Sequence, residues 1–90
     1  MKAKIYKTDG TILEVEPKNK HDFSLEELQK IVGGYIEILH ISNDKIMVID
    51  EEGKLKEKPT NEAATMFFMQ AGFYDTIVGD VLVCDDEMVL

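Results

Sequence analysis

The sequence predicts an α+β domain: a mainly antiparallel sheet of about five strands, built from two hairpins and a final strand, with two helices on one face. Two pairs of short apolar–polar segments flank turn residues, which is typical of hairpins. Two further segments carry helix start and stop signals. The chain has 90 residues, of which 44% are hydrophobic, so we expect residues 1–90 to form a single domain with a packed core.

The first hairpin is expected from Lys2–Lys7 and Thr11–Glu16. A three-residue loop, Thr8-Asp9-Gly10, with Gly10 in the left-handed conformation, sets a register that sorts the side chains by type. Apolar residues then face apolar residues and lysines face glutamates: Ile5 with Leu13, Ala3 with Val15, Lys4 with Glu14 and Lys2 with Glu16. A two-residue loop would instead mix apolar and charged partners, so the longer loop is favoured.

The first helix begins at Ser24, which with Glu27 forms a capping box. Phe23 and Leu28 occupy the positions of a hydrophobic staple. The helix ends at Gly33-Gly34. Its apolar stripe consists of Leu25, Leu28, Ile31 and Val32.

The second hairpin is expected from Tyr35–Ile41 and Lys45–Asp50 across Ser42-Asn43-Asp44. Pairing Ile41 with Ile46 gives both faces apolar pairs, so we expect both strands to be central in the sheet. The pairs are Leu39 with Val48 on one face, and His40 with Met47 and Ile38 with Ile49 on the other. His40 is then interpreted as a structural residue whose ring is hydrogen-bonded.

The second helix is expected to run from Thr60 or Asn61 to Gln70, with Gly72 ending it. It has almost no polar face, so it must be covered on more than one side. Its apolar sides are buried either within the fold or at an interface with a partner protein or a second copy of the chain. The final strand, Ile77–Cys84, is interrupted at Gly79-Asp80. A turn at Asp85-Asp86-Glu87 and a short edge piece at Met88–Leu90 follow it.

The net charge and the type of basic residue limit the classes of partner that the chain is expected to bind. The net charge is −8 and all ten basic residues are lysines, so direct nucleic-acid binding is not expected. Residues 46–90 carry three lysines and ten acids, which leaves an acidic docking surface or a merely solvated face as alternatives. The sequence has neither a membrane-length apolar run nor a signal-peptide core, and a single cysteine forms no internal disulfide. We expect a cytoplasmic protein without membrane contact.

The chemistry-bearing side chains form no recognisable catalytic motif. In the register above, Glu37 faces Asp50, with Glu51 next to it, and close carboxylates are suited to acid–base work or to a hard cation. A charged pair at the open end of a hairpin is the commoner explanation. Cys84 has apolar neighbours and precedes two aspartates, both of which disfavour its thiolate. We therefore assign no catalytic residue, no metal and no cofactor.

Four segments together resemble one small family, domain-of-unknown-function family 3846. They are Gly33-Gly34-Tyr35-Ile36-Glu37, residues 48–55 (VIDEEGKL), Asn61 with Ala64-Thr65, and Val78-Gly79-Asp80-Val81. Lys58-Pro59 stands where a more apolar approach to the proline is expected. The resemblance implies a bacterial, phage or mobile-element setting and no established activity.

The resemblance also draws attention to a recognition cluster of Glu51, Asn61, Thr65 and Asp80 near the start of the second helix. An architectural interpretation competes with it, in which Asn61 caps the helix and Gly79 fits a bulge. The function predicted is a non-enzymatic protein-binding or adaptor module whose partner is a protein. The alternative is a small-ligand-binding domain or an enzyme that uses Glu37, Asp50, Glu51 and Asn61.

Overall fold

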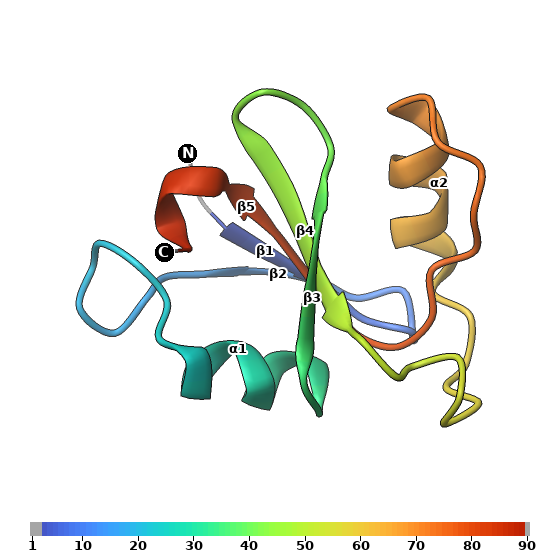
Figure 1. Ribbon diagram of the computed structural model, residues 1–90, viewed down its shortest axis with the longest axis horizontal. Coiled ribbons are helices and arrows are strands. Elements are labelled where there is room, and N and C mark those ends of the chain that lie inside the picture. Colours follow the sequence, from blue (N-terminus) through green and yellow to red (C-terminus); the bar gives the residue numbers. More distant parts are fainter. Residues whose placement is uncertain (1–2, 90) are drawn as a thin grey trace.

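The computed structural model describes residues 3–89 and confirms the α+β class. Its strands are β1 (Ala3–Tyr6), β2 (Ile12–Val15), β3 (Ile36–His40), β4 (Lys45–Asp50) and β5 (Val81–Asp85). Its helices are α1 (Leu25–Val32), α2 (Glu62–Gln70) and a short 3₁₀ helix, η1 (Asp86–Met88). Figure 1 shows the strands between the two α-helices.

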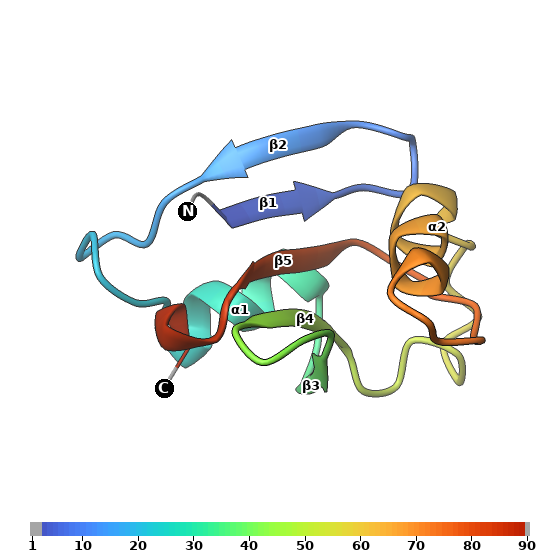
Figure 2. The same cartoon turned by 90° about the horizontal axis from the view of Figure 1, so that it is seen from above.

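The strands form a single sheet in the order β2-β1-β5-β4-β3, and every neighbouring pair is antiparallel. Figure 2 shows this order, with β2 at the top of the view and β3 at the bottom. The two hairpins therefore do not pair with each other. The last strand, β5, lies between them, and its residues Val81, Leu82, Val83 and Cys84 are all buried.

The first hairpin has the predicted register. Ile5 lies opposite Leu13, and Ala3 lies opposite Val15. The backbone N–H of Lys7 donates to the carbonyl of Thr11 at 2.9 Å, which closes the three-residue loop. Gly10 has a φ of +93°, as the left-handed loop position requires. The predicted pairing of Lys2 with Glu16 lies outside the described residues.

The register predicted for the second hairpin is wrong by one residue. Asp50 lies opposite Ile36, so Glu37 does not face it. The backbone N–H of Ile41 donates to the carbonyl of Lys45 at 2.9 Å, so the chain turns through a three-residue loop directly after Ile41. Because these strands are apolar at nearly every position, their side chains alone do not distinguish neighbouring registers.

The prediction that both strands of this hairpin are central holds for β4 but is wrong for β3. In β4, Ile46, Met47 and Val48 are buried. In β3, which forms an edge of the sheet, Ile38 is 37% exposed. His40 is exposed at the end of this strand, not enclosed as a structural histidine would be.

The helix α1 begins and ends where predicted. The Ser24 side chain accepts the Glu27 N–H at 3.1 Å, and the Glu27 carboxylate accepts the Ser24 N–H at 2.9 Å, which completes the capping box. Gly33 ends the helix with a φ of +79°. Leu28 and Val32 are buried, whereas Leu25 is 58% exposed and does not belong to the buried stripe.

The two helices lie on opposite faces of the sheet, which corrects the prediction that they share one face. One core joins α1 to one side of the sheet and contains Phe23, Leu28, Val32, Ala3, Ile46, Val48, Leu82 and Cys84. The other joins α2 to the opposite side and contains Ala64, Phe68, Met47, Ile77, Val81 and Val83. Successive strand residues point to opposite faces, so the uninterrupted apolar runs of β4 and β5 supply both cores.

The helix α2 is less covered than predicted. Asn61 is its N-cap, which decides between the two expected starts. Ala64 and Phe68 are buried, but Met66 is 59% exposed and Met69 is 50% exposed, so one side of the helix faces solvent. None of the helices in the described residues combines the length and the apolar character that crossing a membrane requires.

The final strand begins at Val81, later than predicted. The predicted interruption is real: Gly79 has a φ of +76°, and the chain before it forms only an isolated bridge between Thr60 and Val78. After β5, the predicted edge piece is absent from the described residues. Its residue Met88 belongs to η1, Val89 makes an isolated parallel bridge with Phe23, and Leu90 is outside the described residues.

Candidate functional site

Asp50, at the end of β4, is the buried centre of an ion-pair cluster whose lysines, Lys56 and Lys58, are 39% and 21% exposed. Its carboxylate accepts from Lys58 Nζ at 2.6 Å and Lys56 Nζ at 2.9 Å, and from the Glu52 backbone N–H at 2.9 Å. The Asp50 side chain is 1% exposed. Burial raises its pKa, but these hydrogen bonds and the lysine charges outweigh burial and lower the pKa to about 2. The carboxylate is therefore ionised and held by cations, and the predicted pair with Glu37 is wrong.

The same lysines hold the end of α1. Lys58 Nζ donates to the carbonyl of Val32 at 2.6 Å, and Lys56 Nζ donates to the carbonyl of Gly33 at 3.3 Å. These carbonyls have no partner within the helix, and a cation is favoured at this end. A Cβ on Gly34 would lie 2.9 Å from the Asp50 carboxylate oxygens, so only glycine fits here without a shift. The cluster therefore connects α1, β4 and the segment before α2.

Asn61 is fully buried, and its side-chain amide is completely used by the backbone. Its Nδ2 donates to the carbonyls of Tyr6 at 2.8 Å and Gly79 at 2.9 Å, and its Oδ1 accepts the N–H of Ala64 at 3.0 Å. This side chain thus joins the end of β1, the approach to β5 and the first turn of α2. It has no exposed surface that a ligand could touch.

Thr65 and Asp80 also bind backbone groups near Asn61. The Thr65 hydroxyl accepts the N–H of Ile77 at 2.9 Å and donates to its carbonyl at 3.3 Å. The Asp80 carboxylate accepts the N–H of Thr8 at 3.0 Å. The structure thus places three of the four predicted cluster residues at the start of α2 and at the approach to β5, where each binds backbone groups. Their role in recognition stays a prediction.

Glu51, the fourth predicted cluster residue, lies in the turn after β4. It lines a hollow of about 170 Å³ together with Glu37, Lys54 and Asp75. Lys54 and Asp75 form an exposed ion pair at 2.7 Å. Within residues 3–89, no three His, Cys, Asp or Glu side chains are grouped so that they could hold a metal ion.

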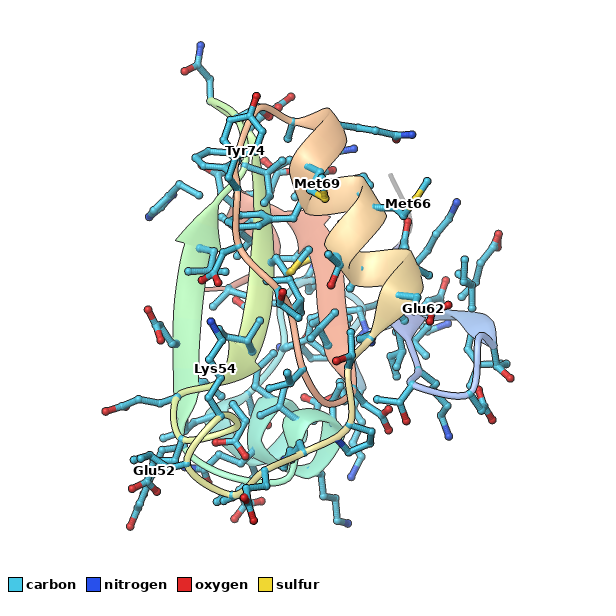
Figure 3. All side chains as sticks on the ribbon, turned by 90° about the vertical axis from the view of Figure 1, so that its right-hand side faces the viewer. Glu52, Lys54, Glu62, Met66, Met69 and Tyr74 are labelled. Carbon is cyan, nitrogen blue, oxygen red and sulfur yellow. The ribbon has the colours of Figure 1, made fainter. Side chains whose placement is uncertain are left out.

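The solvent-facing side of α2 and of the loop after it carries large apolar residues. We call Met66, Met69 and Tyr74 the α2 surface; their exposed fractions are 59%, 50% and 90%. Figure 3 shows these three side chains on the face turned toward the viewer, with Glu62 beside the start of the helix. Met66 also lines a shallow hollow of about 480 Å³ with Thr60, Glu62, Ala63, Thr65 and Thr76. Exposed methionine and aromatic side chains of this kind are typical of binding surfaces.

A second, larger depression lies on the other face of the sheet. It has a volume of about 850 Å³ and separates α1 from the first hairpin. Apolar side chains from both elements line it, including Ile5, Val15 and Ile31. Its charged lining residues have both signs: Glu16, Lys18, Glu26, Glu27 and Lys30.

Cys84 is buried in β5, in the core under α1. Burial and the charges of Asp85 and Asp86 raise the pKa of its thiol to about 11. The prediction that its thiolate is disfavoured is thus confirmed, and Cys84 is not suited to act as a nucleophile.

Sequence reasoning missed Lys56 and Lys58. They looked like part of a polar connection, yet they are the partners of Asp50. One signal was present: alternate lysines in a segment that follows a buried strand, a strand-end aspartate and a turn. For α2 the sequence leaves two alternatives open, burial within the fold or a side that lines an interface, and the exposure of Met66 and Met69 agrees with the second.

Comparison with known protein families gives a match over nearly the whole chain. The model of a family described as "Domain of unknown function (DUF3846)" matches residues 2–88, which is nearly the whole chain. Neither the curated proteins nor the solved structures include a significant match.

Proposed function

The chain belongs to the DUF3846 family, whose description names no activity, so we propose from the geometry that it is a non-enzymatic protein-binding or adaptor module. The α2 surface is the observation that carries this proposal. Met66 and Met69 lie on the solvent-facing side of a helix that holds the sheet through Ala64 and Phe68. The proposal includes the setting that the resemblance implies, a bacterial, phage or mobile-element protein that works in the cytoplasm.

The charges near the α2 surface favour a partner with basic residues. Glu62 is exposed on α2, and the neighbouring hollow is lined by Glu37, Glu51 and Asp75. Lys54 is the only cation among the residues that line this hollow, and Asp75 already pairs with it. A partner segment with apolar side chains for the methionines and basic side chains for the acids fits this combination.

The protein-binding function is better supported than the alternative near Asn61. Two of the four side chains that a ligand site or an active site there would need, Asp50 and Asn61, already serve the fold. Asp50 is bound by two lysines, and the amide of Asn61 is bound by three backbone groups. Releasing Asp50 would strip a buried carboxylate of its lysines, and releasing the Asn61 amide would leave backbone groups unsatisfied, and either change costs free energy.

The test is a pull-down from a bacterial lysate with three forms of the tagged chain. They are the unmodified chain, the double variant M66E/M69E, and a control double variant, L25E/L55E. The control places the same charges at apolar residues that are 58% and 82% exposed outside the α2 surface. We expect M66E/M69E to reduce capture of the partner at least about tenfold, because interface centres of this type carry much of the binding energy.

Circular dichroism melting of all three forms establishes that each is folded. A partner that M66E/M69E retains, or that L25E/L55E loses equally, would refute the assignment to the α2 surface. If the unmodified chain captures no protein, but a small molecule raises its melting temperature and M66E/M69E abolishes this rise, a ligand-binding function replaces the proposal.

A further inference from the structure

The outer side of β3 offers unpaired backbone groups. Among the described strands, β3 pairs with β4 alone. The N–H of Ile41 donates to Lys45 and the N–H of Glu51 donates to the carbonyl of Tyr35, so the odd-numbered residues of this strand direct their backbone groups toward β4. In an antiparallel pair, the alternate residues then direct their N–H and C=O groups outward. For β3 these residues are Ile36, Ile38 and His40.

This edge lacks most of the features that usually protect a sheet edge from pairing. The strand IEILH carries one charged side chain, Glu37, but no lysine, proline or glycine, and its register against β4 is continuous, without a bulge. At the opposite edge, β2 contains Glu14 and is followed directly by Glu16 and Pro17. An unprotected regular edge is suited to pairing with another strand.

The strand β3 is also complementary to itself. The outward residues are symmetric about Ile38, so an antiparallel copy can pair Ile38 with Ile38 and Ile36 with His40, forming about six backbone hydrogen bonds. On the other face, this register sets Glu37 opposite Leu39 and Tyr35 opposite Ile41. The register places no like charges directly opposite each other, and a tyrosine facing an isoleucine is a favourable cross-strand pair.

We propose that β3 is a homodimer interface, at which two copies of the chain pair antiparallel about Ile38 and join their five-stranded sheets into one. Tyr35, which is 69% exposed in the single chain, gains a partner in Ile41 of the second copy. The pairing uses the outward backbone groups of β3 and no side chain of Met66, Met69 or Tyr74, so this inference does not depend on the α2 surface, although Phe68 of α2 and Leu39 of β3 share a core. A dimer therefore displays two α2 surfaces.

The first test is the mass of the chain in solution by sedimentation equilibrium over a range of concentrations. We expect a species of twice 10.2 kDa, and because each chain carries a charge of −8, added salt should favour it. Ile38→Lys places two lysines opposite each other and should give the 10.2 kDa monomer. Leu13→Lys is the matched control, at a residue on the other edge strand that is 41% exposed, against 37% for Ile38.

The second test does not depend on whether Ile38→Lys folds. Directly paired residues have Cα atoms about 5.5 Å apart, which a disulfide can bridge. Ile38→Cys should therefore cross-link two chains under mild oxidation at least about ten times faster than Leu13→Cys, and buried Cys84 should not compete. Equal cross-linking rates, a dimer that persists in folded Ile38→Lys, or an unmodified chain that stays monomeric at millimolar concentration would overturn the proposal.

Discussion

Replacing Asp50 by asparagine should destabilise the fold more than any comparable change of a surface carboxylate. Asparagine keeps an oxygen that can accept the N–H of Glu52, but it removes the charge that Lys56 and Lys58 share. Lys56 and Lys58 are 39% and 21% exposed and can be solvated, so the cost arises mainly at the buried side chain of residue 50, which loses both ion pairs. We expect the free energy of unfolding at pH 7 to fall by about 2 to 4 kcal/mol.

The pKa of Asp50 gives an independent magnitude. A tenfold change in proton affinity corresponds to about 1.4 kcal/mol, so lowering the pKa from 3.8 to about 2 gives the ionised group about 2.5 kcal/mol of stabilisation. Because the folded-state pKa lies below the unfolded one, this stabilisation is complete above about pH 4 and is lost as the pH falls toward 2. Asp50→Asn should lack this part of the pH dependence.

Urea unfolding at pH 7 and at intervals between pH 5 and 2 measures both effects. Asp75→Asn is the matched control, because Asp75 also pairs with a lysine, at 2.7 Å, but both side chains are more than half exposed. An exposed pair contributes about 0 to 1 kcal/mol. The reasoning about Asp50 is refuted if Asp50→Asn costs no more than Asp75→Asn, or if it loses stability between pH 4 and 2 as steeply as the unmodified chain.

Two further predictions concern other buried polar groups. Asn61→Asp turns an oxygen toward the carbonyls of Tyr6 and Gly79, where Nδ2 now donates. The free energy of unfolding, measured with urea at pH 7, should therefore fall by about 3 kcal/mol or more. A fall of less than about 1 kcal/mol would contradict the assigned hydrogen bonds. Cys84, with its thiol pKa raised to about 11, should react with a disulfide reagent at pH 8 only after urea is added. Rapid stoichiometric labelling of the folded chain would show that β5 is more accessible than its burial implies.

The local signals of the sequence predicted local structure well. The capping box at Ser24 and Glu27 and the end of α1 at Gly33 depend on contacts between near neighbours, and both are present. The register of the first hairpin followed from charge and apolar pairing, because only one register separates the two kinds of residue.

The wrong predictions concern strands that are apolar on both faces, because there the type of a side chain does not indicate which face it lies on. The second hairpin is apolar on both faces, so its register was missed by one residue and Asp50 was assigned the wrong neighbour. The apolar runs of β4 and β5 also hid the arrangement of helices, because a strand buried on both faces is compatible with helices on either side. The lysine partners of Asp50 depend on how residues 51–58 fold back, which no periodic pattern encodes.

For the candidate site, the sequence indicated Asn61 and Thr65 as neighbours on one helical turn, and both lie there. The sequence could not indicate that every hydrogen bond of the Asn61 side-chain amide is made with the backbone. Two of the partners, Tyr6 and Gly79, lie far from Asn61 in the sequence. The exposure of Met66 was equally inaccessible, because it depends on which side of α2 meets the sheet.

The central position of β5 has a consequence for the order of folding. Each hairpin joins strands that are close in sequence and can close within microseconds, but Tyr6 meets Val81 only across almost the whole described chain. Until β5 docks, the inner edges of β1 and β4 are unpaired, and such edges are prone to aggregate. During synthesis this interval lasts until β5 has left the ribosome. The speed with which this one strand inserts therefore governs how long the nascent chain is exposed to misassembly.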